Sequence, residues 1–141
     1  MQTQTLENQT AKVAPINDVA ELIDREVHAK TLEQINVLAR EYEIRNPSEV
    51  AAFLSKNKSL IDWLEEIPAR IREHFGAGQK LILRFFLDPE DPTAHCLHVR
   101  LPTKLETQNA RQLLEKFDEQ WWNENEINCS FKIFVNLDFV K

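Results

Sequence analysis

The chain has 141 residues, of which 43% are hydrophobic and 28% charged, and this is enough for one domain with a packed interior. Its two glycines, Gly76 and Gly78, cannot supply the three glycines of a dinucleotide-binding turn or the spacing of a Walker phosphate loop. The formal net charge of −6 argues against nonspecific binding to DNA or RNA.

Cysteine usage and the start of the chain bear on the compartment. Cys96 and Cys129 are too few for a disulfide framework or a four-thiolate zinc site. The first ten residues have neither the basic nor the apolar segment of a signal peptide, and no apolar stretch is long enough to span a bilayer. We therefore expect a cytoplasmic protein that uses no metal or cofactor and does not enter a membrane.

The first 45 residues divide into a tail and a helical arm. Residues 1–15 are rich in Gln, Thr and Asn, which predicts a disordered tail. Apolar residues at spacings of three and four predict one long helix or two shorter ones over 17–43. We expect this helical N-terminal arm to cover residues 16–45 and an α+β domain to follow over 46–141.

Two further helices open that domain. The run Asn46-Pro47-Ser48-Glu49 predicts a capped helix start, with a helix that ends near residue 57. A second helix is predicted over 59–75, with a kink or a break before Pro68. Gly76 is expected to close this helix in a left-handed conformation.

After Gly78 the apolar period changes from 3.6 to two. Alternation predicts strands over 81–87, 94–101 and 129–139, and an amphipathic helix over 105–123. Proline and aspartate predict a turn over 88–93, and Pro102 is expected to end the second strand. In the last strand the residues expected to point inward are Cys129, Phe131, Ile133, Val135, Leu137 and Phe139.

The predicted order is therefore N-terminal helices followed by β-β-α-β. We expect an α+β fold in which a three-stranded antiparallel sheet, with strand order 2-1-3, packs on the helices as a two-layer sandwich. In the alternative arrangement the third strand lies beside the second through a right-handed parallel crossover.

One face of this sheet gathers the candidate reactive residues. Cys96 and His98 are expected to share the outer face with Arg100, and a Cys–His pair could activate a thiolate. The alternative function is therefore a small enzyme, hydrolase or nuclease-like, that uses Cys96 and His98. Two points argue against it: residues i and i+2 of a strand are roughly 6.5–7 Å apart at Cα, and no third group that would orient the histidine is evident.

The same face mixes aromatic with basic residues, as RNA-recognition sheets do. The acidic surroundings and the missing Lys/Arg-Gly-Phe motif argue against nucleic acid as the partner. We expect the N-terminal helices or a second subunit to cover the face. The candidate residues on it are Arg84, Phe86, Cys96, His98, Arg100 and Phe134.

An adjacent tryptophan pair suggests an interface on the predicted helix over 105–123. Residues 105–128 hold six acidic and two basic residues, and adjacent helical side chains point about 100° apart. Trp121 continues the apolar stripe, so Trp122 is expected at an acidic edge, where it could anchor a partner; the alternative is that it packs under the N-terminal helices. The proposed partner-binding residues are Trp122, Glu119, Glu124, Ile35, Leu38 and Tyr42.

Three short sequence elements resemble those of a known family. They are Ile71-Arg72-x-x-Phe75-Gly76, Leu87-Asp88-Pro89-Glu90 and Phe117-Asp118-Glu119-x-Trp121-Trp122. Over its C-terminal half to two-thirds the chain resembles a family of small uncharacterised bacterial proteins with a C-terminal β-β-α-β layout. The resemblance implies that layout and no site residues. Our leading hypothesis is a non-enzymatic interaction or regulatory protein, antitoxin-like in one version, that binds a protein partner or a second copy.

Overall fold

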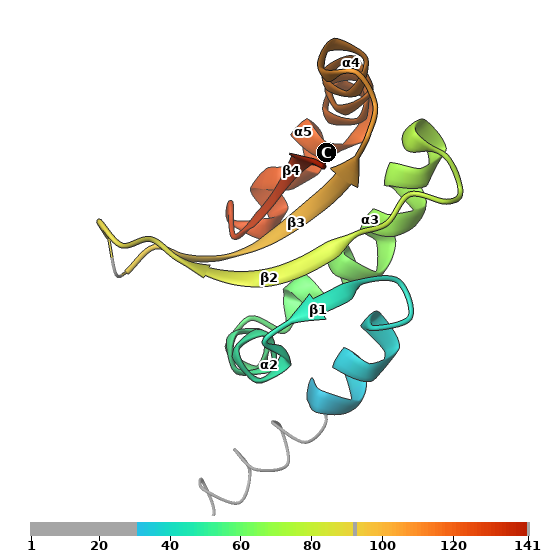
Figure 1. The fold of residues 1–141 in the computed structure, drawn as a ribbon. Coiled ribbons are helices and arrows are strands. Elements are labelled where there is room, and N and C mark those ends of the chain that lie inside the picture. The colour runs from blue at the N-terminus through green and yellow to red at the C-terminus, as the bar shows by residue number, and fades with distance from the viewer. Residues whose placement is uncertain (1–30, 92, 141) are drawn as a thin grey trace, which may run out of the picture.

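The computed structural model describes residues 31–91 and 93–140, so the expected tail over 1–15 lies outside them. A helix over 31–38 comes first, and Figure 1 shows the elements that follow. They are β1 (Glu43–Arg45), α2 (Pro47–Lys56), α3 (Ser59–Phe75), β2 (Ile82–Leu87), β3 (His95–Thr103), α4 (Thr107–Phe117), a π-helix (Asp118–Trp122), α5 (Asn123–Asn125), a 3₁₀-helix (Glu126–Cys129) and β4 (Ile133–Phe139).

The sheet has four strands in the order β1-β2-β3-β4. The β1–β2 and β3–β4 pairs are parallel, and only the β2–β3 hairpin is antiparallel. The predicted three-stranded antiparallel sheet with order 2-1-3 is therefore wrong. The reason is that β1 occupies the edge of β2 that the predicted order assigned to the last strand, so β4 joins β3 instead.

Strand β1 lies within the segment that the sequence predicts as a helical arm. It has only three residues, with Ile44 between the charged Glu43 and Arg45, which is too short to show a strand period. The chain before it contributes Ile35, Leu38 and Tyr42 to the same hydrophobic core as the rest of the molecule. Residues 31–45 are therefore an integral part of the α+β unit.

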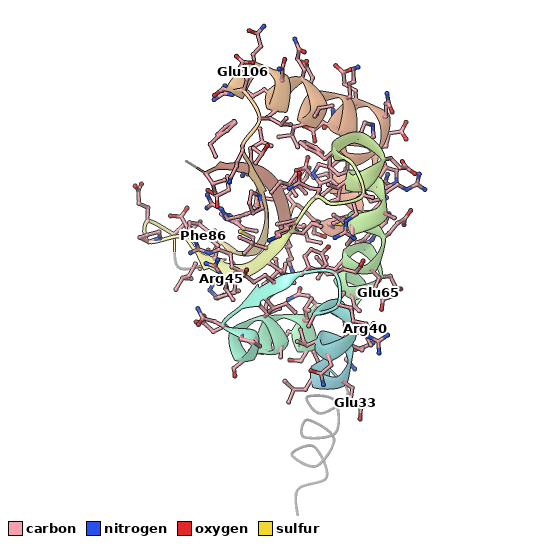
Figure 2. The ribbon with its side chains drawn as sticks, turned by 45° about the vertical axis from the view of Figure 1, so that its right-hand side comes forward. Glu33, Arg40, Arg45, Glu65, Phe86 and Glu106 are labelled. Carbon is pink, nitrogen blue, oxygen red and sulfur yellow. The ribbon has the colours of Figure 1, made fainter. Side chains whose placement is uncertain are left out.

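The core lies between the helices and one face of the sheet. Alternate sheet residues, among them Leu83, Val99 and Ile133, are fully buried against apolar side chains of α2, α3 and α4. Figure 2 shows α3 on one side of the sheet and the side chains of Arg45 and Phe86 toward the other side. No helix in the described part of the chain is long and apolar enough to cross a membrane.

Helix α3 runs through Pro68 without a break, contrary to expectation. Proline has no N–H, so the carbonyl of Leu64 loses the helical hydrogen bond that residue 68 would normally donate. The buried hydroxyl of Tyr42 donates to this carbonyl at 2.7 Å. A side chain from another element thus satisfies the acceptor that the proline leaves free.

The helix boundaries mostly follow the sequence signals. Helix α2 begins at Pro47 as expected, but Asn46 has left-handed backbone angles (φ 51°, ψ 66°) and its side chain makes no capping bond. The chain must turn sharply from β1 into α2 there, which explains this conformation. Gly76 closes α3 with φ 100° and ψ 157°, a positive-φ conformation outside the left-handed helical region.

The strand boundaries differ from the prediction at two places. Strand β3 continues through Pro102 to Thr103, because residue 102 faces the β2 side and β2 pairs with β3 only as far as Arg100, so the missing N–H breaks no bond between the described strands. The Pro102 carbonyl accepts from the Gln79 side chain at 2.8 Å. Strand β4 begins at Ile133, not at residue 129, because Ser130 and Phe131 have positive φ values of 53° and 56°. Phe131 and Phe139, expected to point inward, are 55% and 42% exposed.

Candidate functional site

The structure separates the residues proposed for partner binding. Trp122 is only 3% exposed and belongs to the core, whereas Trp121 is partly exposed. Ile35, Leu38 and Tyr42 are also core residues, so these four side chains offer a partner almost no surface. Glu119 and Glu124 remain exposed on the acidic segment.

A π-helical turn explains why Trp122 is buried and Trp121 is partly exposed, the reverse of the expected arrangement. The N–H of Asn123 donates to the carbonyl of Asp118, five residues earlier, where an α-helix would use residue 119. The wider turn lets both tryptophan rings contact Phe117, at centroid distances of 5.8 Å for Trp121 and 6.3 Å for Trp122. The expected position of Trp122 at an exposed edge is wrong, because that expectation holds only for a regular α-helix.

The outer face of the sheet brings all six sheet-face candidates together. Arg84 of β2 lies opposite His98 of β3, and His98 lies opposite Phe134 of β4. Phe86 pairs with Cys96 in the neighbouring row. Arg100 lies two residues beyond His98, and therefore on the same face.

An aromatic cluster forms the centre of this face. The rings of Phe86 and His98 are stacked, with centroids 4.5 Å apart and an interplanar angle of 15°. Phe134 meets His98 edge to face at 5.9 Å and is itself 38% exposed. We call Phe86, His98 and Phe134 the aromatic cluster.

The charges around the cluster keep its histidine neutral. Burial lowers the pKa of His98 below its usual value of 6.5, and the nearby guanidinium groups of Arg84 and Arg100 lower it further. At neutral pH the imidazole is therefore an uncharged ring. It contributes stacking and dispersion to the face rather than positive charge.

Positive charge on the face comes from arginines. Arg84 forms no ion pair with any residue of the described ranges, whereas Arg45, its neighbour across the β1–β2 pair, is paired with Glu43. Arg100 pairs with Asp138 at 3.2 Å, and its buried Nε has no hydrogen-bond partner in the described part of the chain. The face therefore combines one unpaired guanidinium with an incompletely satisfied one.

A cavity of about 480 Å³ opens at one end of this face, between the β2–β3 turn and the residues that precede β4. The aromatic cluster forms part of its lining, together with Cys96, Phe131 and Lys132. The Lys132 ammonium donates to Asn57 at 2.7 Å. The cavity is large enough to receive a side chain or a small ligand.

The proposed thiol chemistry has little support on this face. Cys96 is 7% exposed, and burial, with a contribution from Asp88, raises the pKa of its thiol. A Cys–His mechanism needs a thiolate beside an imidazolium, but the pKa shifts of Cys96 and His98 both disfavour these charged forms. Cys129 is buried elsewhere, and burial followed by the charge of Glu126 raises its pKa to about 11.

Metal binding is not indicated by side-chain geometry either. Across residues 31–91 and 93–140, no three His, Cys, Asp or Glu side chains come together as a metal site would require.

Two parts of the site could not be predicted from the sequence. Arg45 stands on a strand too short to be recognised, so nothing in the sequence placed it beside Arg84. Phe131 was assigned to the inward side of a regular strand, whereas its positive φ makes it an exposed side chain at the cavity. The pairing of β1 with β2 reveals the first, and the backbone conformation of residue 131 reveals the second.

The chain matches no known protein-family model, no curated protein and no solved structure. Inference about its function therefore depends on the site itself.

Proposed function

We propose that this protein is a non-enzymatic binding module, and that its outer sheet face receives a protein partner carrying apolar and acidic side chains. The observation that carries the proposal is the row formed by Arg84, His98 and Phe134 across three strands. This row places the Arg84 guanidinium, which pairs with no carboxylate of the described residues, directly beside a partly exposed aromatic cluster.

The chemistry of the row argues for that type of partner. A stacked, neutral His98 and an exposed Phe134 offer contact area with little conformational freedom to lose. Arg84 can form charge-assisted hydrogen bonds with a carboxylate, and the adjacent cavity can accept an apolar side chain. Aromatic and arginine residues are the types enriched where protein interfaces bind most strongly.

The antitoxin-like version would instead use the acidic surface of the segment after α4 to bind a basic partner. Glu119 and Glu124 are available for it, but the expected anchor Trp122 is buried. An interface formed by exposed charges alone contributes mainly to association rate and selectivity. The sheet face therefore has the better support.

The enzyme alternative rests on Cys96 and His98. The raised pKa of the thiol and the lowered pKa of the imidazole both work against it. Binding without catalysis requires neither the Cys96 thiol nor the His98 imidazole to carry a charge.

Site-specific photo-crosslinking in the producing cells tests the proposal. A photoreactive phenylalanine at position 86 should yield a protein crosslink, whereas the same group at the exposed position Arg111 on α4 should not. Adding Arg84→Glu should abolish the crosslink at position 86. A crosslink at 86 that survives Arg84→Glu, or one that forms only at position 111, would contradict the proposal.

Direct titration with single-stranded RNA tests the alternative that the outer sheet face binds nucleic acid. We expect no change in fluorescence anisotropy when the purified chain is added to a labelled oligonucleotide at low salt. Binding that disappears with Arg84→Glu would assign the face to nucleic acid instead.

A further inference from the structure

The two edges of the sheet differ in how they are protected from pairing with another strand. Strand β1 is three residues long, carries Glu43 and Arg45, and is followed by left-handed Asn46 and by Pro47. Short length, charge and proline are the usual means by which an edge strand avoids association. This edge is well protected.

Strand β4 is less well protected. It is seven residues long, contains no proline, and its one charged residue, Asp138, is already paired with Arg100. No other strand of the described residues lies beside it. A long, largely apolar edge of this kind is a template for strand addition.

The hydrogen bonds to β3 reveal which backbone groups of β4 point outward. The carbonyl of Lys132 accepts from Leu97, and the N–H of Val140 donates to Thr103, so even-numbered residues face β3. Because the N–H and C=O of one strand residue point to the same side, the groups of Ile133, Val135 and Leu137 face away from the sheet. These are the groups that a further strand would use.

We infer that β4 pairs antiparallel with β4 of a second copy of this chain, around a two-fold axis at Val135. In this register Val135 lies opposite the partner's Val135, and Ile133 lies opposite the partner's Leu137. All of these residues have outward-facing backbone groups, as a hydrogen-bonded antiparallel pair requires.

Charge selects this register. Lys132, which directly precedes β4, lies opposite the partner's Asp138, and the symmetry repeats the pair on the other side of the axis. Within one chain Arg100 binds only Oδ1 of Asp138, and Asn57 accepts one of the three N–H groups of the Lys132 ammonium, so both side chains keep capacity for this further contact. Shifting the partner strand by two residues in either direction keeps the outward-facing backbone groups paired. It places Asp138 opposite the partner's Phe134 or the partner's Ser130, and the opposite charges no longer meet. Opposite charges directly across a strand pair stabilise it, and like charges destabilise it.

The resulting dimer has one continuous eight-stranded sheet, with the outer faces of the two copies side by side. This inference goes beyond the proposed function, because β4 can pair whether or not the aromatic cluster binds a partner. The crosslinking position at Phe86 lies on β2, two strands from the inferred interface.

Sedimentation velocity over a dilution series of the purified full chain tests the inference. We expect a species with twice the chain mass of 16.5 kDa. Leu137→Pro removes an outward N–H that no strand of the described residues uses, so it should give a folded monomer. Leu137→Ala loses the same side-chain packing but keeps the N–H, and should remain a dimer.

Charge exchange provides the second test. Lys132→Asp should raise the dimer dissociation constant roughly tenfold, because two like-charge pairs form in each dimer. Adding Asp138→Lys to that variant should restore association. If Leu137→Pro does not fold, as judged by circular dichroism, the charge pair decides the question. A wild-type chain that is monomeric throughout, or a dimer that is unaffected by Lys132→Asp, would overturn the inference.

Discussion

Tyr42 and Pro68 lie in different parts of the chain but depend on one carbonyl group. Pro68 leaves the carbonyl of Leu64 without its helical donor, and the Tyr42 hydroxyl donates to it at 2.7 Å. Burial raises the pKa of this phenol well above its usual value of 10, so the hydroxyl stays protonated and able to donate at any ordinary pH. The proline and the tyrosine therefore act as a pair.

Tyr42→Phe should lower the free energy of unfolding by about 1–3 kcal/mol, since it leaves a buried acceptor unsatisfied. In a Pro68→Ala background the new N–H at residue 68 can donate to Leu64, so the same substitution should cost less. Urea denaturation of the four variants of this cycle measures the difference. Equal costs in both backgrounds would show that the hydroxyl does not replace the missing helical bond.

At the scale of elements, the π-helical turn after α4 is the feature that most alters the sequence-based picture. The amphipathic helix predicted over 105–123 is present in α4, where Ala110 and Phe117 are buried. The prediction failed at Trp122 because a stripe drawn with 3.6 residues per turn does not allow for the wider turn over 118–122. Local periodicity predicted the helix but could not predict where its period changes.

Trp122→Ala should destabilise the protein by about 3–5 kcal/mol, because it removes a large side chain from the core. Trp121→Ala is the matched control and should cost less, since Trp121 is partly exposed and packs against Trp63 and Arg70 at the surface. Thermal denaturation followed by circular dichroism compares the two. If Trp122→Ala were the milder variant, the assignment of Trp122 to the core would be wrong.

Asp118 makes the same turn sensitive to pH. Burial raises the pKa of its carboxyl to about 6, and neighbouring carboxylates add to the rise, namely those of Glu126, Glu115 and Glu119. Since the folded state holds this proton more tightly than the unfolded chain, the stabilisation is full below about pH 4. It is lost as the pH rises through 6.

Asp118→Asn should therefore exceed the wild type in free energy of unfolding at pH 8, and this advantage should disappear toward pH 4. Denaturant titrations at a series of pH values measure it. Glu65→Gln, a change to an exposed carboxylate on α3, provides the control and should show no advantage that follows this pH window. An advantage of Asp118→Asn that did not change with pH would contradict the assignment.

At the scale of the whole molecule, residues 31–45 complete the core. Ile35 and Leu38 are at most 4% exposed, and β1 covers one edge of β2. Removing either side chain from a core usually costs about 2–5 kcal/mol, against a typical total stability of about 5–15 kcal/mol. The segment is thus too large a part of the core to be dispensable.

A fragment of residues 46–141 should therefore fail to fold, in contrast to the full chain. Amide proton dispersion in a two-dimensional NMR spectrum distinguishes the two cases. A well-dispersed spectrum from the fragment would mean that residues 31–45 are an addition to a self-sufficient domain.

The sequence by itself determined the local elements: helices α2, α3 and α4, the β2–β3 hairpin, most of β4, and the set of residues that share the outer sheet face. These follow from periodicity, proline, glycine and capping residues, which act over a few positions along the chain. Only the tertiary structure decided the strand order, the existence of β1 and the burial of Trp122. Strand order depends on which edge is already occupied by a segment distant in sequence, and burial depends on a helical period that tertiary packing can change. The scarcity of glycine excluded phosphate-binding loops, and the fold places the candidate chemistry on a sheet face and a sheet edge.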